Sequence, residues 1–291
     1  MQYFDLHCDT LYKATVENSD FNNDYHISLN KVSFLDKWTQ LFAIWIPDEL
    51  KGLEATALFL KAVEVFRKNK INNEAIDMFL SVENASMLNG DLNNIDLLVK
   101  NSVKSITLTW NGENELGCGA GCNNSFGLTN FGKEVVKQLE ENSIAVDVSH
   151  CSDKLFYDVI NIARKPIFAS HSNSRAVTDV KRNLTDEQFC IIRDMGGIVG
   201  LNFYKGFLSN DENKACIDDL LRHAEHFLNL NGENTVAIGS DFDGADMPND
   251  MMGIESVKSI YNRFIDEFGA KLTKKIFFYN ANMYFTNFDN I

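Results

Sequence analysis

Short, nearly continuous apolar runs recur eight times along the chain, with more polar stretches between them. Runs of this length without regular polar alternation are typical of parallel strands that are buried on both faces of a sheet. The eight predicted strands cover residues 2–7, 39–46, 76–83, 103–110, 143–150, 165–172, 196–203 and 235–242.

Amphipathic segments separate these runs. The segment 54–69 carries apolar residues at helical spacing and turns its Lys and Arg residues outward. Ser152 and Thr185 are good N-cap residues for the helices that follow them, and Gly232 is a suitable helix stop. The predicted helical regions are 54–69, 130–142, 152–164, a helix that opens at 185, 215–232 and 255–285.

Strand and helix alternate along the whole sequence, which predicts an α/β fold of the (β/α)₈, TIM-barrel type. An open doubly wound sheet is the alternative, but no glycine-rich phosphate-binding pattern follows the first strand. Hydrophobic residues make up 45% of the chain, enough for a large core, and no linker rich in Gly, Ser or Pro interrupts it. We therefore expect a single domain over residues 1–291.

The charge balance narrows the classes of partner. The formal net charge is −14, and the sequence contains no basic run or stripe. We therefore expect neither a nucleic acid nor an anionic membrane surface as a partner. No apolar run reaches the roughly 18 residues that a membrane-spanning helix needs, so we expect no such helix.

Six cysteines are a low density for disulfides in a chain of 291 residues. No signal-peptide pattern precedes the first predicted strand, which begins at residue 2. We therefore expect reduced thiols and a cytoplasmic protein. Cys118 and Cys122 have a C-x₃-C spacing, a weak signal for zinc or redox chemistry, and a Gly-rich loop over the site is the preferred interpretation.

Ionisable residues gather where the predicted strands end. In a barrel of this type the active site lies at the C-terminal ends of the strands. Buried charge is costly unless it is paired or binds a metal, so ionisable residues at buried strand ends indicate a shared site. These residues are His7, Asp9, Glu83, His150, His171, Asp241 and Asp243.

Imidazole and carboxylate ligands without thiolate suit zinc, and also manganese, iron or cobalt. Five or more ligands are too many for one tetrahedral catalytic zinc that keeps an open position. They suit two metal ions ~3.5–4 Å apart that share a bridging carboxylate. His7 and Asp9 are two residues apart, so strand alternation points both side chains the same way, toward the first metal.

Each residue also has a structural interpretation. A single His at a strand end is more often a hydrogen-bonding residue than a ligand, Glu83 could cap a helix, and the Asp-Phe-Asp-Gly segment at 241–244 could be a turn. The joint placement on five strand ends favours the metal site. For His223 and His226, three residues apart on a helix, we expect surface or packing roles.

Several segments resemble the membrane dipeptidase (renal dipeptidase) family of zinc metallopeptidases, within the amidohydrolase superfamily. The resemblance runs through nearly the whole chain. It rests on "DLHCDT" at the start, "SVENA" after the third strand, and three longer blocks that are specific together: "GLTNFGKEVVKQLEENSIAVDVSH", "ASHSNSRAVTDVKRNLTDEQ" and "AIGSDFDGAD".

The resemblance implies two zinc ions. His7, Asp9 and Glu83 would hold one zinc, and Glu83, His150 and His171 the other, so that Glu83 bridges the pair.

The resemblance also implies roles around the metals. Asp241 would be the proton-shuttling carboxylate, and Arg182 would bind the C-terminal carboxylate of the substrate through its bidentate fork. The chain departs from mammalian-type members in one place. Trp110 stands in "LTWNGEN" where those members have a substrate-contacting His, and Asn111 could substitute as a donor.

The sequence therefore resembles a binuclear zinc dipeptidase that uses a metal-bridging hydroxide on short peptides. Another hydrolase on the same barrel, acting on a lactone, cyclic amide or phosphoester, is one alternative. A non-catalytic metal-binding protein is the other, and the intact carboxylate at Asp241 favours an enzyme. A small peptide is the expected partner, and the chain could form a homodimer.

Overall fold

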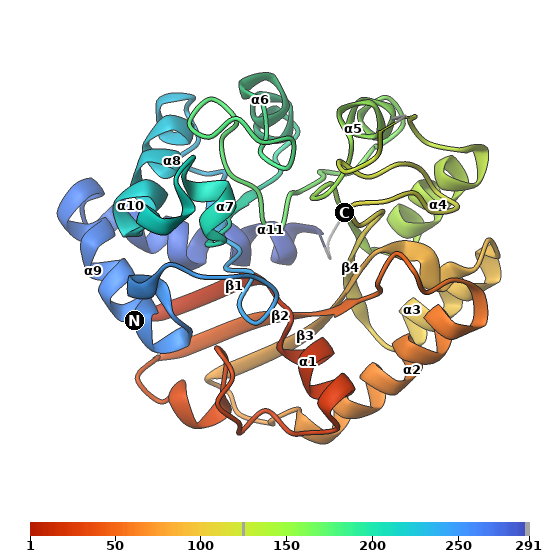
Figure 1. Cartoon of the computed structure of the whole chain (residues 1–291), viewed down its shortest axis with the longest axis horizontal. Coiled ribbons are helices and arrows are strands. Elements are labelled where there is room, and N and C mark those ends of the chain that lie inside the picture. Colours follow the sequence, from red (N-terminus) through yellow and green to blue (C-terminus); the bar gives the residue numbers. More distant parts are fainter. Residues whose placement is uncertain (124–125, 289–291) are drawn as a thin grey trace.

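The structure, a computed structural model, describes residues 1–123 and 126–288. Its centre is a seven-stranded parallel sheet in the order β5-β4-β3-β2-β1-β7-β6, with helices packed around it (Figure 1). The strands are β1 (Gln2–Cys8), β2 (Lys37–Trp45), β3 (Ile76–Glu83), β4 (Val103–Thr107), β5 (Ala145–Asp147), β6 (Val199–Leu201) and β7 (Val236–Ile238).

The predicted strand 165–172 is wrong as a regular strand, yet this segment joins the two edges of the sheet. Its residues form isolated parallel bridges to both edge strands, Phe168 to Asp147 and Ala169 to Val199. The ladder breaks because Ser170 donates its backbone N–H to the Asp147 carboxylate, at 3.0 Å, instead of to a strand carbonyl. The segment therefore closes the eight-membered ring, and the predicted (β/α)₈ barrel is confirmed.

Each predicted helical region contains a helix, whereas the helices at 10–17, 95–100 and 205–208 were not predicted. Ser152 caps α5 through its hydroxyl, which accepts from the Leu155 N–H, and Thr185 forms a capping box with Gln188 at the start of α6. The helices are α1 (Thr10–Glu17), α2 (Gly52–Asn69), α3 (Ile95–Lys100), α4 (Asn130–Glu141), α5 (Asp153–Ile160), α6 (Asp186–Asp194), α7 (Lys205–Leu208), α8 (Ile217–Asn229), α9 (Val257–Phe268), α10 (Ala270–Lys274) and α11 (Asn280–Phe288).

The predicted helical region 255–285 is divided. Gly269, with φ of 79°, separates α9 from α10, and a π-helical turn over Lys275–Tyr279 precedes α11. α11 packs Tyr284, Phe285 and Phe288 against a buried cluster that includes Phe4 of β1 and Phe168. In the described part of the chain, no helix combines the length and the apolar character needed to cross a membrane.

Candidate metal centre

The structure brings together all five predicted metal ligands, although the first is residue 7 and the last is residue 171. Parallel strands place their C-terminal ends at one edge of a barrel, which explains the convergence. Each of these side chains is at least nine-tenths buried. They are His7 in β1, Asp9 just after it, Glu83 at the end of β3, His150 after β5, and His171 in the segment that closes the barrel.

Glu83 lies between two groups of ligands. Its Oε1 is 2.8 Å from His150 Nε2 and 3.7 Å from His171 Nε2. Its Oε2 is 3.6 Å from His7 Nε2, which in turn lies 3.2 Å from Asp9 Oδ2. One carboxylate oxygen thus faces each group, which is the arrangement a bridging ligand requires.

The hydrogen bonds of the two later histidines leave their Nε2 atoms free for a metal. His150 Nδ1 lies 3.0 Å from Asn111 Oδ1, and His171 Nδ1 lies 2.7 Å from Ser170 Oγ. The two Nε2 atoms are only 2.9 Å apart, both aimed at the same space. Such outer partners commonly fix the tautomer of metal-binding histidines.

Asp9 supplies a second indication that the donor set fits a metal. Within residues 1–123 and 126–288, its buried Oδ1 has no hydrogen-bond partner. A buried carboxylate oxygen without a partner is costly, and a metal ion would satisfy it. The side chains of this cluster therefore fit a divalent metal ion.

The electrostatics of the cluster show an excess of buried negative charge. Burial alone would lower the pKa of His7, but Asp9, Glu83 and Asp241 outweigh it and raise that pKa to about 10. Burial raises the pKa of Glu83 well above its ordinary value. A bound cation would relieve this crowding of carboxylates.

Asp241 lies at the rim of the same cluster. Its Oδ2 accepts a hydrogen bond from Asn202 Nδ2 at 3.0 Å, and its Oδ1 is 3.8 Å from His7 Nε2. Burial raises the pKa of Asp241 to about 6, a value suited to proton transfer near neutral pH. Asp241 is also near enough to His7 and His171 to be a ligand itself.

Backbone strain gathers at this rim. His150, Asp241 and Asp243 all have φ between 64° and 67°, a region that non-glycine residues rarely adopt and that is enriched at functional sites. Gly244 follows them, and a Cβ there would lie 2.0 Å from Asp9 Oδ2. Any side chain at this position would displace Asp9.

Asp243 points away from the cluster. Its carboxylate accepts from the backbone N–H groups of His26 and Ile27 and from the Thr10 hydroxyl. Asp243 therefore anchors the loop at residue 26, and His26 Nδ1 accepts from the Asp243 N–H in return.

Arg182 reaches the centre from the loop after the closing segment. Its Nη2 donates to the His171 carbonyl at 3.3 Å, and its guanidinium carbon stacks 5.1 Å from the Phe207 ring centre. Its buried Nε has no hydrogen-bond partner in the described part of the chain. Burial lowers the pKa of Arg182, while Glu83 and Asp241 oppose that effect, so a cationic fork with free donor capacity stands beside the carboxylates.

A cavity of about 630 Å³ opens over the cluster. Trp110 and Asn111, to which the family resemblance gives substrate contacts, line it. Asn111 also holds His150, a contact that strand positions do not reveal. The sequence analysis missed four aromatic lining residues, Tyr12, Trp45, Tyr204 and Phe207. Trp45 ends β2, so it would have been found by considering every residue at a strand end and not only the ionisable ones.

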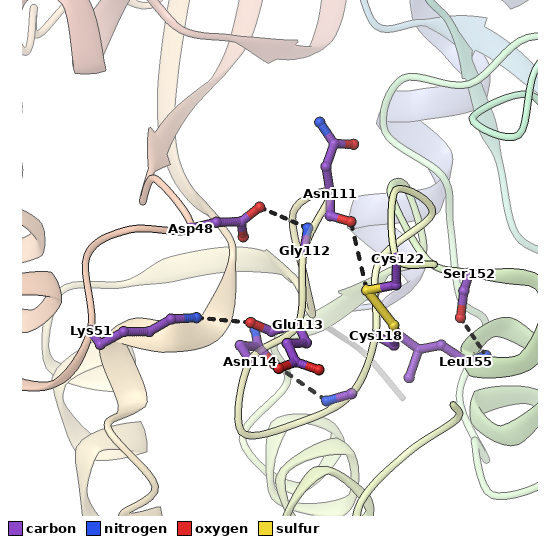
Figure 2. The surroundings of a disulfide bond; sticks show 11 residues. Asp48, Lys51, Asn111, Gly112, Glu113, Asn114, Cys118, Cys122, Ser152 and Leu155 are labelled. Atoms are coloured by element: carbon purple, nitrogen blue, oxygen red, sulfur yellow. Dashed lines mark hydrogen bonds between the residues drawn. A yellow bond between two sulfur atoms is a disulfide. The ribbon is translucent and has the colours of Figure 1, made fainter. Parts of the chain in front are cut away.

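A disulfide joins Cys118 and Cys122 (Figure 2), and the expectation of reduced thiols is wrong at this pair. The two sulfurs meet because the short loop between them folds against the segment 110–112. Gly119 N donates to the Gly112 carbonyl, and Ala120 N donates to the His150 carbonyl at 2.8 Å. The expected Gly-rich loop therefore lies beside the site, and it supports the backbone that carries Asn111.

The two histidines of α8 do not join a metal cluster in the described residues. His223 is fully buried, where its Nδ1 accepts from Ser174 N and its Nε2 lies 3.1 Å from the Leu208 carbonyl. His226 pairs with Asp186 near the surface. His223 therefore has a packing role and His226 a surface role, as expected.

A model of the membrane dipeptidase family (Peptidase family M19) matches residues 1–281. An uncharacterized protein in the pqqA 5′ region of Klebsiella pneumoniae is 33% identical over 216 residues, 70% of this chain and 78% of that protein. The uncharacterized dipeptidase C965.12 of Schizosaccharomyces pombe is 31% identical over 201 residues, 67% of this chain but only 47% of that protein.

Solved structures share the fold over nearly the whole chain. A metallo peptidase from Rhodobacter sphaeroides, solved with a phosphinate mimic of the dipeptide L-Ala-D-Ala, has a TM-score of 0.90 at 23% identity, covering 98% of this chain and 99% of that one. The dipeptidase AC has a TM-score of 0.91 at 24% identity, with 98% of each chain covered.

Proposed function

The chain belongs to the membrane dipeptidase family of metal-dependent peptidases, and on this premise we propose a binuclear zinc enzyme that hydrolyses dipeptides with a free C-terminal carboxylate. One observation carries the proposal: Glu83 directs its two oxygens at two separate groups of ligands. A single metal would need only one of these groups.

The residues divide into two sites around that carboxylate. His7 and Asp9 would hold one ion and His150 and His171 the other, with Glu83 shared. Zinc held by these residues would supply Lewis-acid polarisation of a peptide carbonyl and would lower the pKa of a nucleophilic water toward neutrality.

The other residues have roles that follow from their contacts. Asp241, held by Asn202, would accept a proton from the attacking water and deliver it to the leaving amine. Arg182, whose Nε has no hydrogen-bond partner in the described part of the chain, would bind the substrate carboxylate. Asn111 would orient His150, and Trp110 would contact the substrate from the cavity wall.

Metal content provides the first test. We expect about two zinc ions per chain in metal-replete protein, measured by elemental analysis. Glu83→Gln should lower the occupancy of both sites, because both share that carboxylate. Glu140→Gln is the matched control, since Glu140 is also a buried glutamate but accepts hydrogen bonds from Arg164 N and Lys165 N, away from the cluster. One ion per chain at saturating zinc would contradict the proposal.

A substrate panel separates the remaining alternatives. Zinc-loaded protein should hydrolyse free dipeptides faster than lactones, cyclic amides or phosphoesters. The panel should include D-residues at the C-terminal position, since the Rhodobacter structure contains a mimic of L-Ala-D-Ala. No turnover of any compound would favour a non-catalytic metal-binding protein. The cytoplasmic location and a homodimer stay predictions.

A further inference from the structure

Three aromatic side chains form a continuous surface on one side of the cavity, which we call the aromatic wall: Tyr12, Trp45 and Trp110. The ring centres of Tyr12 and Trp45 are 4.7 Å apart, and those of Trp45 and Trp110 are 4.9 Å apart, both edge-to-face. All three rings are half-buried and line the cavity, so each keeps one surface open to a ligand. The wall ends at His150, whose ring centre is 6.2 Å from that of Trp110.

The closed ring of strands places this wall across the metal centre from Arg182. Around the ring, β2 is the second position, and the closing segment that carries His171 is the sixth of eight. Positions two and six of an eight-membered ring are diametrically opposite. Trp45 ends β2, and Arg182 is tied to the carbonyl of His171. A substrate with its carboxylate at Arg182 would therefore extend its other end toward the wall.

The chemistry of the wall favours an apolar group. Its three rings present mostly carbon atoms, and Trp45 Nε1 is buried without a hydrogen-bond partner in the described part of the chain, so the polar atoms that remain on the wall are the Tyr12 hydroxyl and Trp110 Nε1.

We propose that the aromatic wall of Tyr12, Trp45 and Trp110 is the subsite for the side chain of the substrate's N-terminal residue, and that it selects dipeptides with an apolar or aromatic residue at that position. This inference rests on the proposed dipeptidase function. It assigns to Trp110 a specificity role in place of the His of the mammalian-type relatives.

The first measurement is the substrate profile of the zinc-loaded enzyme. We expect kcat/KM for Phe-Ala and Leu-Ala to exceed that for Gly-Ala by about ten- to a hundredfold, the scale expected for burying one apolar side chain. The reversed pairs, Ala-Phe and Ala-Gly, test the other end of the substrate and should differ less. A preference confined to the C-terminal residue would overturn the inference.

The second measurement uses variants of the wall. Trp45→Ala and Trp110→Ala should each lower kcat/KM for Phe-Ala about tenfold more than they lower kcat/KM for Gly-Ala. Trp110→Phe should retain most of the preference for Phe-Ala over Gly-Ala. All three variants should keep the zinc content and the thermal unfolding temperature of the wild type. Tyr279→Ala is the matched control, because Tyr279 is a 45% exposed aromatic residue that does not line this cavity.

The two levels of the proposal can fail separately. If the zinc-loaded wild type hydrolyses neither Phe-Ala nor Gly-Ala, the dipeptidase function itself is wrong. If it hydrolyses both, but the wall variants lower both equally, the wall supports His150 and does not select the substrate.

Discussion

Asp241 combines three features of a general base: it is held by Asn202, its pKa is raised to about 6 by burial, and its Oδ1 lies 3.8 Å from Nε2 of His7, a proposed metal ligand. We predict that Asp241→Asn keeps the fold and the zinc content of the wild type but loses at least ~10²-fold in kcat, the usual scale of acid–base catalysis. Turnover and zinc content are measured on the same sample.

The outcome separates two roles for this side chain. Loss of zinc together with activity would show that Asp241 is a ligand, as its proximity to His7 and His171 allows. Asp243→Asn is a useful comparison. Asp243 anchors the loop at residue 26, so its replacement should lower stability more than it lowers turnover.

Replacing Arg182 tests whether its positive charge recognises the C-terminal carboxylate of the substrate. We predict that Arg182→Ala lowers kcat/KM for free dipeptides about ten- to a hundredfold, since a charge-assisted hydrogen bond contributes roughly 1.5–3 kcal/mol. C-terminally amidated dipeptides lack the charge and should lose far less. Equal losses on both would mean that Arg182 instead supports the loop through the His171 carbonyl and the Phe207 ring.

At this scale the sequence predicts the positions of the ligands better than their partners. Residues at strand ends such as Glu83 and His150 are predictable, because the fold class fixes where strand ends meet. The bond from Asn111 to His150 depends on the conformation of a loop with no regular periodicity. Tyr12 was missed because it lies on α1, beyond the strand end.

Among the elements, the loop from Cys118 to Cys122 shows how an irregular segment supports the site. Its backbone approaches that of Trp110 so closely that a Cβ on Gly119 would lie 2.0 Å from the Trp110 carbonyl oxygen. Figure 2 shows the disulfide next to Asn111 and Gly112, which lie on the neighbouring stretch of backbone. A glycine at 119 is therefore a packing requirement.

We predict that Gly119→Ala lowers the free energy of unfolding by about 1–3 kcal/mol, the cost of overpacking. It should also lower kcat/KM, because Ala120 N supports the His150 carbonyl in the same loop. Gly269→Ala is the control: its Cβ would meet nothing within 4 Å, so strain at φ of 79° should destabilise the fold without changing kcat/KM. Unchanged activity in Gly119→Ala would show that the loop does not support the centre.

The elements also show where sequence patterns stop being informative. The strand predicted at 76–83 matches β3 residue for residue, because it pairs along its whole length with β2. The predicted strand 165–172 has the same apolar character but forms only two bridges. Two of its backbone N–H groups donate to side chains instead of strand carbonyls: Ser170 N to the Asp147 carboxylate and His171 N to the Ser149 hydroxyl. The apolar pattern of this segment correctly predicts that it is buried, but the hydrogen bonds of its backbone determine whether it forms a regular strand.

For the whole molecule, barrel closure makes the site. The closing segment brings His171 beside His150, and β7 brings Asp241 beside His7, so ligands far apart in sequence meet only in the folded chain. The chain carries a net charge of −14, and three of its carboxylates, those of Asp9, Glu83 and Asp241, lie at this centre. Folding and metal binding are therefore expected to be linked, with zinc stabilising the closed barrel.

His223 gives the whole fold a pH dependence that is independent of the metal centre. It is buried in α8, where it accepts from Ser174 N and lies 3.1 Å from the Leu208 carbonyl, so it joins α8 to the loop that leads to Arg182 and to α7. Burial lowers its pKa from 6.5 to about 4. The unfolded chain therefore binds a proton at a higher pH than the folded chain does.

Because the pKa of His223 is lower in the folded chain, acid destabilises the fold through this residue. The contribution of His223 to stability is complete above pH 6.5 and is lost as the pH falls from there toward 4. We predict that the free energy of unfolding of the metal-free wild type falls by about 2 kcal/mol more than that of His223→Gln between pH 7.5 and 5. Glutamine can accept from Ser174 N and donate to the Leu208 carbonyl, but it does not titrate. Parallel curves of unfolding free energy against pH for the two proteins would show that His223 stays neutral in both states or is protonated without cost.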